Sequence, residues 1–165
     1  MAAYGTDDGF LAYHIARGRD VATIDEDAIA PARLVASEWL DGAFRAQFPG
    51  LKVGLRAQVR EWPRQGANDI YGYAIASDVP PVEIDNATYE ATYREIKTPG
   101  SLVKDWTPSK YKRASVDGAV SVDFAMFNSA SDIQTQFLAI GQILAPILTA
   151  VGGDFSALSG ATSRV

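Results

Sequence analysis

The sequence predicts a mainly α-helical protein, a four-helix bundle-like domain with one β-hairpin and long loops. Four stretches carry apolar residues at the spacing of amphipathic helices. A fifth stretch, about residues 112–124, alternates apolar and polar residues around an Asp-Gly pair, as β-hairpins do. A chain of 165 residues with 47% apolar side chains fits one folded domain. We place this domain at residues 1–151 and a flexible tail at residues 152–165.

The first two predicted helices cover about residues 6–17 and 25–45. Thr6 and the acidic residues after it can cap the first helix, and a glycine follows its end. The second helix has a face of small apolar residues, which lets a neighbouring helix approach closely. Pro31 removes one internal hydrogen bond, so we expect it near the first turn or at a kink.

The third predicted helix starts after Pro80-Pro81 and ends at Thr98-Pro99-Gly100. The fourth runs from about Asp132 to Val151, and Pro146 predicts a kink within it. Between the third and fourth helices, we expect residues 112–116 and 119–124 to form the two strands of the hairpin, joined by a two-residue turn.

A long connection, residues 58–89, links the second helix to the start of the third. Pro63 biases Trp62 away from helical angles, and the connection contains glycines suited to turns. Loops of this length in compact domains are functional or held by their own packing, and both alternatives stay open. We expect Trp62 to be the buried anchor of this loop, because an indole brings a large apolar area.

Composition excludes several classes of protein. The chain contains no cysteine, which excludes disulfides and thiolate metal sites. No apolar run approaches the roughly 20 residues of a membrane span, and the first residues lack the features of a signal peptide. A net charge of −5 argues against a general nucleic-acid binder, although a local basic patch would survive this argument.

The residues that carry chemistry are scarce. The sequence has no Cys/His metal spacing, no phosphate-binding glycine loop and no nucleophile elbow. His14 is the only histidine, and on an apolar helix face we expect it to be a hydrogen-bonded packing residue. We therefore predict no catalytic residues, no metal site, no cofactor and no enzymatic activity.

The chain resembles the head-tail adaptor (connector) proteins of tailed bacteriophages, a family whose members are often labelled DnaT-like single-stranded-DNA-binding proteins. The resemblance covers about residues 6–151. It rests on the segments Tyr13–Gly18, Ala36–Asp41, Gln58–Gly66, Gly72–Glu90, Gly118–Phe124 and Leu144–Leu148, which include the Trp62-Pro63-Arg64 tripeptide and the helix start at Pro80.

This resemblance implies a structural virion protein in the neck between head and tail, present in the host cytoplasm during assembly. Its subunits would form a ring, usually of twelve, attached beneath the portal protein. The ring would join the DNA-filled head to the tail or to a stopper protein, and DNA would pass through its lumen without specific binding. No catalytic residue and no membrane contact is implied.

Two sets of candidate site residues follow. The tail residues are expected to contact the portal, since a flexible end with spaced apolar groups can order on a partner; these are Phe155, Leu158 and Val165. The loop and hairpin supply candidate loop anchors and subunit-interface residues, which are Arg60, Trp62, Arg64, Tyr71, Tyr73, Val120, Val122 and Phe124.

An alternative function is a single-stranded-DNA-binding replication protein of a phage. Such proteins interleave aromatic side chains with basic ones. In this sequence the cluster that fits lies in the central loop and consists of Arg56, Arg60, Trp62, Arg64, Tyr71 and Tyr73.

Overall fold

The computed structural model describes residues 3–103, 113–116, 120–123 and 137–149, and it confirms the mainly helical fold. Its α-helices are α1 (Asp7–Ile15), α2 (Glu26–Phe44), α3 (Val82–Lys97) and α4 (Leu138–Leu144). The 3₁₀ turns within the described residues are η1 (Arg45–Gln47), η2 (Leu55–Ala57) and η4 (Ala145–Ile147). Two antiparallel pairs join β1 (Leu51–Lys52) to β2 (Arg64–Gln65) and β3 (Arg113–Val116) to β4 (Val120–Asp123).

Both N-terminal helices begin at a capping side chain, and the cap of α1, Thr6, is one of those that the sequence indicates. The Thr6 hydroxyl accepts a hydrogen bond from the Gly9 amide at 3.0 Å, and the Asp25 carboxylate accepts one from the Asp27 amide at 3.1 Å. Helix α2 continues through Pro31, which lies beyond the first turn on an exposed face. The backbone carbonyl four residues before Pro31 receives no hydrogen bond from it, but on this exposed face water can solvate that carbonyl. The free-energy cost of the proline within the helix is therefore lowered.

The prediction for the last helix is wrong at its C-terminal end. Helix α4 ends at Leu144 rather than continuing to Val151, and the 3₁₀ turn η4 follows it. Pro146 has no amide hydrogen for the i−4 bond, so the α-helical pattern stops there instead of kinking and continuing. The part of the predicted helix before Phe137 lies outside the described residues.

The hairpin exists, but its predicted two-residue turn is wrong. Val116 pairs with Val120, which leaves three residues between the strands instead of Asp117-Gly118 alone. Three-residue connections are also common in hairpins, and an Asp-Gly-Ala sequence is compatible with either length. The shift of one residue changes every cross-strand partner in the register.

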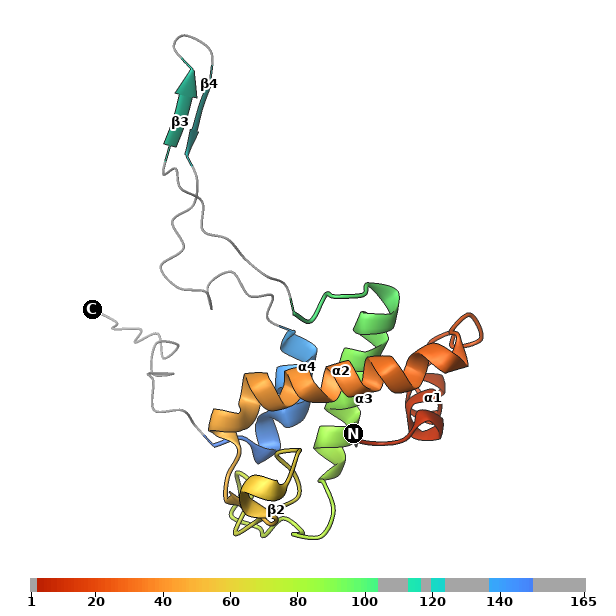
Figure 1. Cartoon of the computed structure of the whole chain (residues 1–165), viewed down its shortest axis with the longest axis vertical. Helices are drawn as coiled ribbons and strands as arrows, with labels where there is room; N and C mark the ends of the chain where they lie inside the picture. The colour runs from red at the N-terminus through yellow and green to blue at the C-terminus, as the bar shows by residue number, and fades with distance from the viewer. Residues whose placement is uncertain (1–2, 104–112, 117–119, 124–136, 150–165) are drawn as a thin grey trace, which may run out of the picture.

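Helices α2, α3 and α4 enclose the main core (Figure 1). Small residues let α2 and α3 approach closely, because Ala36 on α2 faces Ala87 and Ala91 on α3 within a fully buried cluster. Ile140 and Leu144 of α4 belong to the same buried cluster, and α4 packs against α3.

Helix α1 packs on α3 through a second, aromatic core. Tyr89 of α3 lies against Gly5 and Gly9, where an added Cβ atom would overlap its ring. Its hydroxyl also accepts a hydrogen bond from the Thr6 amide at 3.1 Å. These glycines therefore fix how closely α1 can dock, and this docking sets the position of the residues that follow α1.

Trp62 is buried in the main core, 2% exposed, with its ring edge-on to Phe48 at 5.7 Å between centroids. Its backbone amide donates to the Tyr4 hydroxyl at 3.0 Å, and the same hydroxyl donates to Asp41 at 2.7 Å. The chain before α1, helix α2 and the central loop are thus joined at one point.

We predict that Trp62→Ala lowers the free energy of unfolding by about 3–5 kcal/mol, because it removes a fully buried indole. Urea unfolding measures this change. Tyr73→Ala, at a side chain that is 72% exposed in the same loop, is the control and should change stability little. Equal effects of the two substitutions would contradict the role of Trp62 as the anchor.

Candidate nucleic-acid interface

The central-loop cluster predicted from the sequence is not one surface. Trp62 is in the core, and Arg60 and Arg64 are each only 7% exposed. Arg60 pairs with Asp41 at 3.3 Å and with Glu38 at 3.4 Å. Its charge is therefore balanced within the protein and contributes little attraction for a phosphate.

Arg64 has a structural role of a different kind. Its guanidinium donates to the carbonyl oxygens of Pro49 and Gly50, each at 2.7 Å, and pairs with Glu61 at 2.8 Å. These donors satisfy two backbone carbonyls, which would otherwise need another partner or water. Arg64 thus holds the turn before β1 in place.

Arg56, Tyr71 and Tyr73 are the members of the predicted cluster that the structure exposes. Their roles at an interface stay predictions. Val120 and Val122 lie on strand β4, whose backbone alone is described. Phe124, Phe155, Leu158 and Val165, and the boundary between domain and tail, lie outside the described residues.

A second group of cations and rings lies where α1 and α3 end, and we call it the cation–aromatic cluster. The Arg17 guanidinium carbon is 3.4 Å from the centre of the Tyr13 ring. Arg19 and the Lys97 ammonium lie over Tyr93, at 5.0 Å and 5.5 Å from its centre. The Arg94 guanidinium carbon lies 5.6 Å from the centre of the Phe137 ring.

Glu90 lies at the centre of this cluster, and its carboxylate joins three of its members. It pairs with Arg19 at 3.0 Å and Arg94 at 2.8 Å, and it accepts a hydrogen bond from the Tyr13 hydroxyl at 3.2 Å. Burial by itself would raise the pKa of Glu90, but the hydrogen bonds and charges of Arg94 and Arg19 outweigh it and lower the pKa. The carboxylate therefore stays ionised and orients both arginines.

His14 fixes Arg19 from the other side. Its Nδ1 lies 3.0 Å from the Arg19 guanidinium and its Nε2 lies 3.1 Å from the Tyr89 carbonyl oxygen. A guanidinium can only donate, so Nδ1 is the acceptor and Nε2 carries the proton. The imidazole is neutral in this arrangement and is fully buried.

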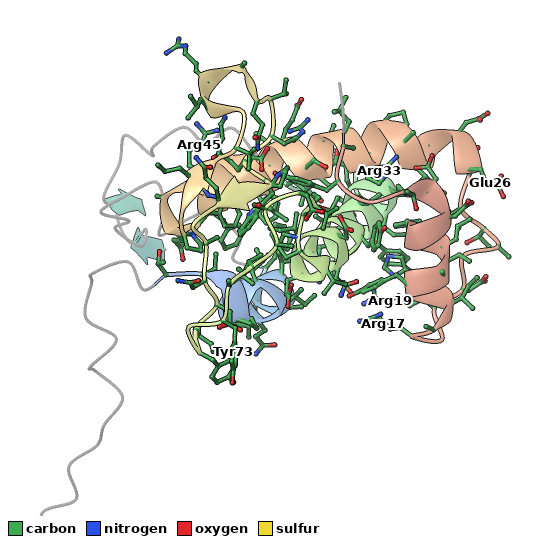
Figure 2. The ribbon with its side chains drawn as sticks, turned by 90° about the horizontal axis from the view of Figure 1, so that it is seen from below. Arg17, Arg19, Glu26, Arg33, Arg45 and Tyr73 are labelled. Atoms are coloured by element: carbon green, nitrogen blue, oxygen red, sulfur yellow. The ribbon has the colours of Figure 1, made fainter. Side chains whose placement is uncertain are left out.

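The cluster is locally positive although the chain is acidic. The cluster has four cations, on Arg17, Arg19, Arg94 and Lys97, and one carboxylate, on Glu90. These groups together carry an excess of three positive charges, whereas the net charge of the whole chain is −5. Arg17 and Lys97 are exposed, and the side chains of Arg19 and Arg94 retain 33% and 28% exposure. Figure 2 shows Arg17 and Arg19 at the outer end of α1.

This cluster was missed in the sequence because its members come from separate elements. The available signals were Tyr93, Arg94 and Lys97, which bring an aromatic and two basic residues into the last turns of one helix. Cations at a helix C-terminus are ordinarily explained by the helix dipole. Nothing in the sequence indicates that the end of α1 meets them.

Two kinds of feature are absent from the described residues. Among those residues, no group of three or more His, Asp or Glu side chains could hold a metal ion. The helices described there lack the combined length and apolar character needed to cross a bilayer.

We predict that stability depends on pH through His14. Burial lowers its pKa below the usual value, which the unfolded chain keeps at about 6.5. The unfolded state then binds more protons than the folded state below about pH 6.5, so the free energy of unfolding should fall as the pH is lowered through this range. Urea unfolding at about pH 7 and about pH 5.5 measures the change.

His14→Gln is the matched variant, because an amide can still donate to the Tyr89 carbonyl and accept from Arg19. It should lose this part of the pH dependence. Asp41 and Asp85, whose pKa values burial raises, are common to both proteins and cancel in the comparison. Parallel pH profiles of the two proteins would contradict the assignment of the titration to His14.

Comparison with known proteins corrects the function expected from the sequence. No curated protein and no solved structure matches the chain. A family model described as "Putative DnaT-like ssDNA binding protein" matches residues 2–165.

The prediction of a head-tail adaptor is therefore wrong, and with it the portal, tail and stopper partners, the twelve-membered ring and the place in the virion neck. The description of the matched family names no adaptor, portal or tail protein. The family's description instead names the binding function that the sequence left as the alternative. The chain belongs to the family of DnaT-like single-stranded-DNA-binding proteins.

Proposed function

We propose that this protein binds single-stranded DNA without catalysis, and that the cation–aromatic cluster contacts the phosphate backbone. The observation that carries the proposal is the local excess of three positive charges, held in fixed positions on an acidic chain. Membership of a family described by single-stranded-DNA binding supports it. The proposed role is binding alone, with no catalytic step.

The geometry of the cluster favours phosphate as the group that it contacts. Arg17 and Lys97 project from the ends of α1 and α3 and are exposed. Arg19 is oriented by Glu90, His14 and the Tyr93 ring, so little side-chain entropy is lost when a phosphate binds it. Arginine planes can also stack with unpaired bases, which duplex DNA does not present.

The negative charge of the rest of the chain lowers the affinity for DNA that we expect. Long-range repulsion between DNA and a chain of net charge −5 opposes association, whereas contacts at the cluster favour it. Binding is then modest and steeply dependent on salt. For single strands the logarithm of the binding constant falls with the logarithm of the salt concentration by about 0.7 for each phosphate contact.

We predict that the double variant Arg17→Gln/Lys97→Gln weakens binding of a fluorescein-labelled oligothymidine on the order of tenfold at about 0.1 M salt. The salt slope, which is the fall of the logarithm of the binding constant with the logarithm of the salt concentration, should become smaller by about 1.4. Fluorescence anisotropy across a salt series measures both quantities. The expectation follows from the loss of two phosphate contacts.

The matched control is Arg45→Gln, compared with the single variant Arg17→Gln. Each removes one positive charge at an exposed arginine, and Arg45 lies outside both the cluster and the central loop; Figure 2 shows Arg45 on the opposite side of the molecule from Arg17 and Arg19. The control should retain wild-type affinity and slope. Equal losses in both variants would contradict a localised site, and absence of binding by the wild-type protein at low salt would contradict the proposed function.

A further inference from the structure

The turn at residues 69–73 presents two aromatic side chains in a preformed arrangement. The Asp69 carboxylate accepts hydrogen bonds from the amides of Tyr71 at 2.9 Å and Tyr73 at 2.8 Å. The Asp69 amide donates to the Tyr73 carbonyl at 2.9 Å, and Gly72, with φ of +86°, completes the turn. One aspartate thus fixes the backbone from which both tyrosines project.

The turn is also fixed to the helical core. The Ile70 amide donates to the Pro146 carbonyl in η4 at 2.9 Å, and the Ile75 amide donates to the Ala67 carbonyl at 2.9 Å. Asn68 and Ala74 form an antiparallel bridge at the base of the turn. Its position relative to α4 is therefore defined, which is what a pre-organised binding element needs.

Both rings are open to a ligand. Tyr71 is 76% exposed and Tyr73 is 72% exposed. Within the described part of the chain, no ring–ring or cation–ring contact involves either of them. Tyrosine is enriched at binding interfaces, because its ring is apolar and its hydroxyl can form a hydrogen bond.

The turn and the cation–aromatic cluster provide complementary contacts. In the cluster, cations already cover the Tyr13 and Tyr93 rings, so charge is available but free aromatic faces are few. The turn offers free faces, and the charge of Asp69 is engaged by backbone amides. Figure 2 shows Tyr73 at the lower left and Arg17 and Arg19 at the right beside α1, so a strand that meets both regions must run across the molecule.

We infer that Tyr71 and Tyr73 stack with bases of the same strand whose phosphates contact the cation–aromatic cluster. The inference rests on the proposed function and extends it to a second contact region. Proteins that bind single strands without sequence preference combine cations along the backbone with rings on which bases stack. Every base has an aromatic face, so these contacts tolerate any sequence.

Oligonucleotide length tests this inference. An oligothymidine of about 4 nucleotides can occupy the cluster alone, whereas one of about 16 can reach both regions. We predict that Tyr71→Ala/Tyr73→Ala binds the longer oligonucleotide at least about tenfold more weakly than wild type, because base stacking is lost. Its affinity for the short oligonucleotide and its salt slope should stay unchanged, since the tyrosines contact no phosphate. Anisotropy measures all three.

The control variant Tyr71→Phe/Tyr73→Phe keeps both rings and should retain wild-type binding of the longer oligonucleotide. Both double variants should keep the wild-type melting temperature, because the side chains are exposed.

Wild-type binding of the longer oligonucleotide by the alanine variant would overturn the inference and leave the turn as a surface for a protein partner. Equal losses for both lengths would also overturn it. In either case the proposed function stands as long as Arg17→Gln/Lys97→Gln weakens binding. Absence of binding by the wild-type protein overturns both proposals.

Discussion

A buried carboxylate, Glu90, is the constraint on which the end of the molecule formed by α1 and α3 depends. Its residue is only 4% exposed, so ionisation is costly unless donors surround it. The Tyr13 hydroxyl, Arg19 and Arg94 are those donors, and they come from α1, from the segment after it and from α3. Satisfying one buried charge therefore fixes three segments together and leaves the outer faces of two arginines toward solvent.

A comparable junction lies beside the main core. Tyr4 contacts Asp41 through its hydroxyl and receives the Trp62 amide, which joins the N-terminal segment, α2 and the central loop. The basic residues of that loop serve the same purpose, since Arg60 pairs with Asp41 and Arg64 satisfies backbone carbonyls. These arginines stabilise the loop from within, so their presence in the sequence does not make a nucleic-acid surface.

The helices and the buried Trp62 could be predicted from sequence because each depends on local spacing and on side-chain size. The end of α4 and the hairpin register were missed, since Pro146 and the Asp-Gly pair each permit two local outcomes. A stronger reason prevented prediction of the cation–aromatic cluster. Its rings and cations meet only after α1 docks on α3, and the glycines that permit this docking look like ordinary helix-start residues.

The net charge of −5 by itself predicts weak attraction for DNA, yet an average charge says little about a site held in place by buried contacts. Glu90 orients Arg19 and Arg94 in the cluster, and it also competes with a phosphate for these two arginines. A phosphate that approaches Arg19 or Arg94 must share them with a carboxylate that is already in place, whereas Arg17 and Lys97 have no such competitor in the cluster. In the proposed complex the inner arginines set the geometry, the outer cations supply most of the salt-dependent attraction, and the strand remains easy to release.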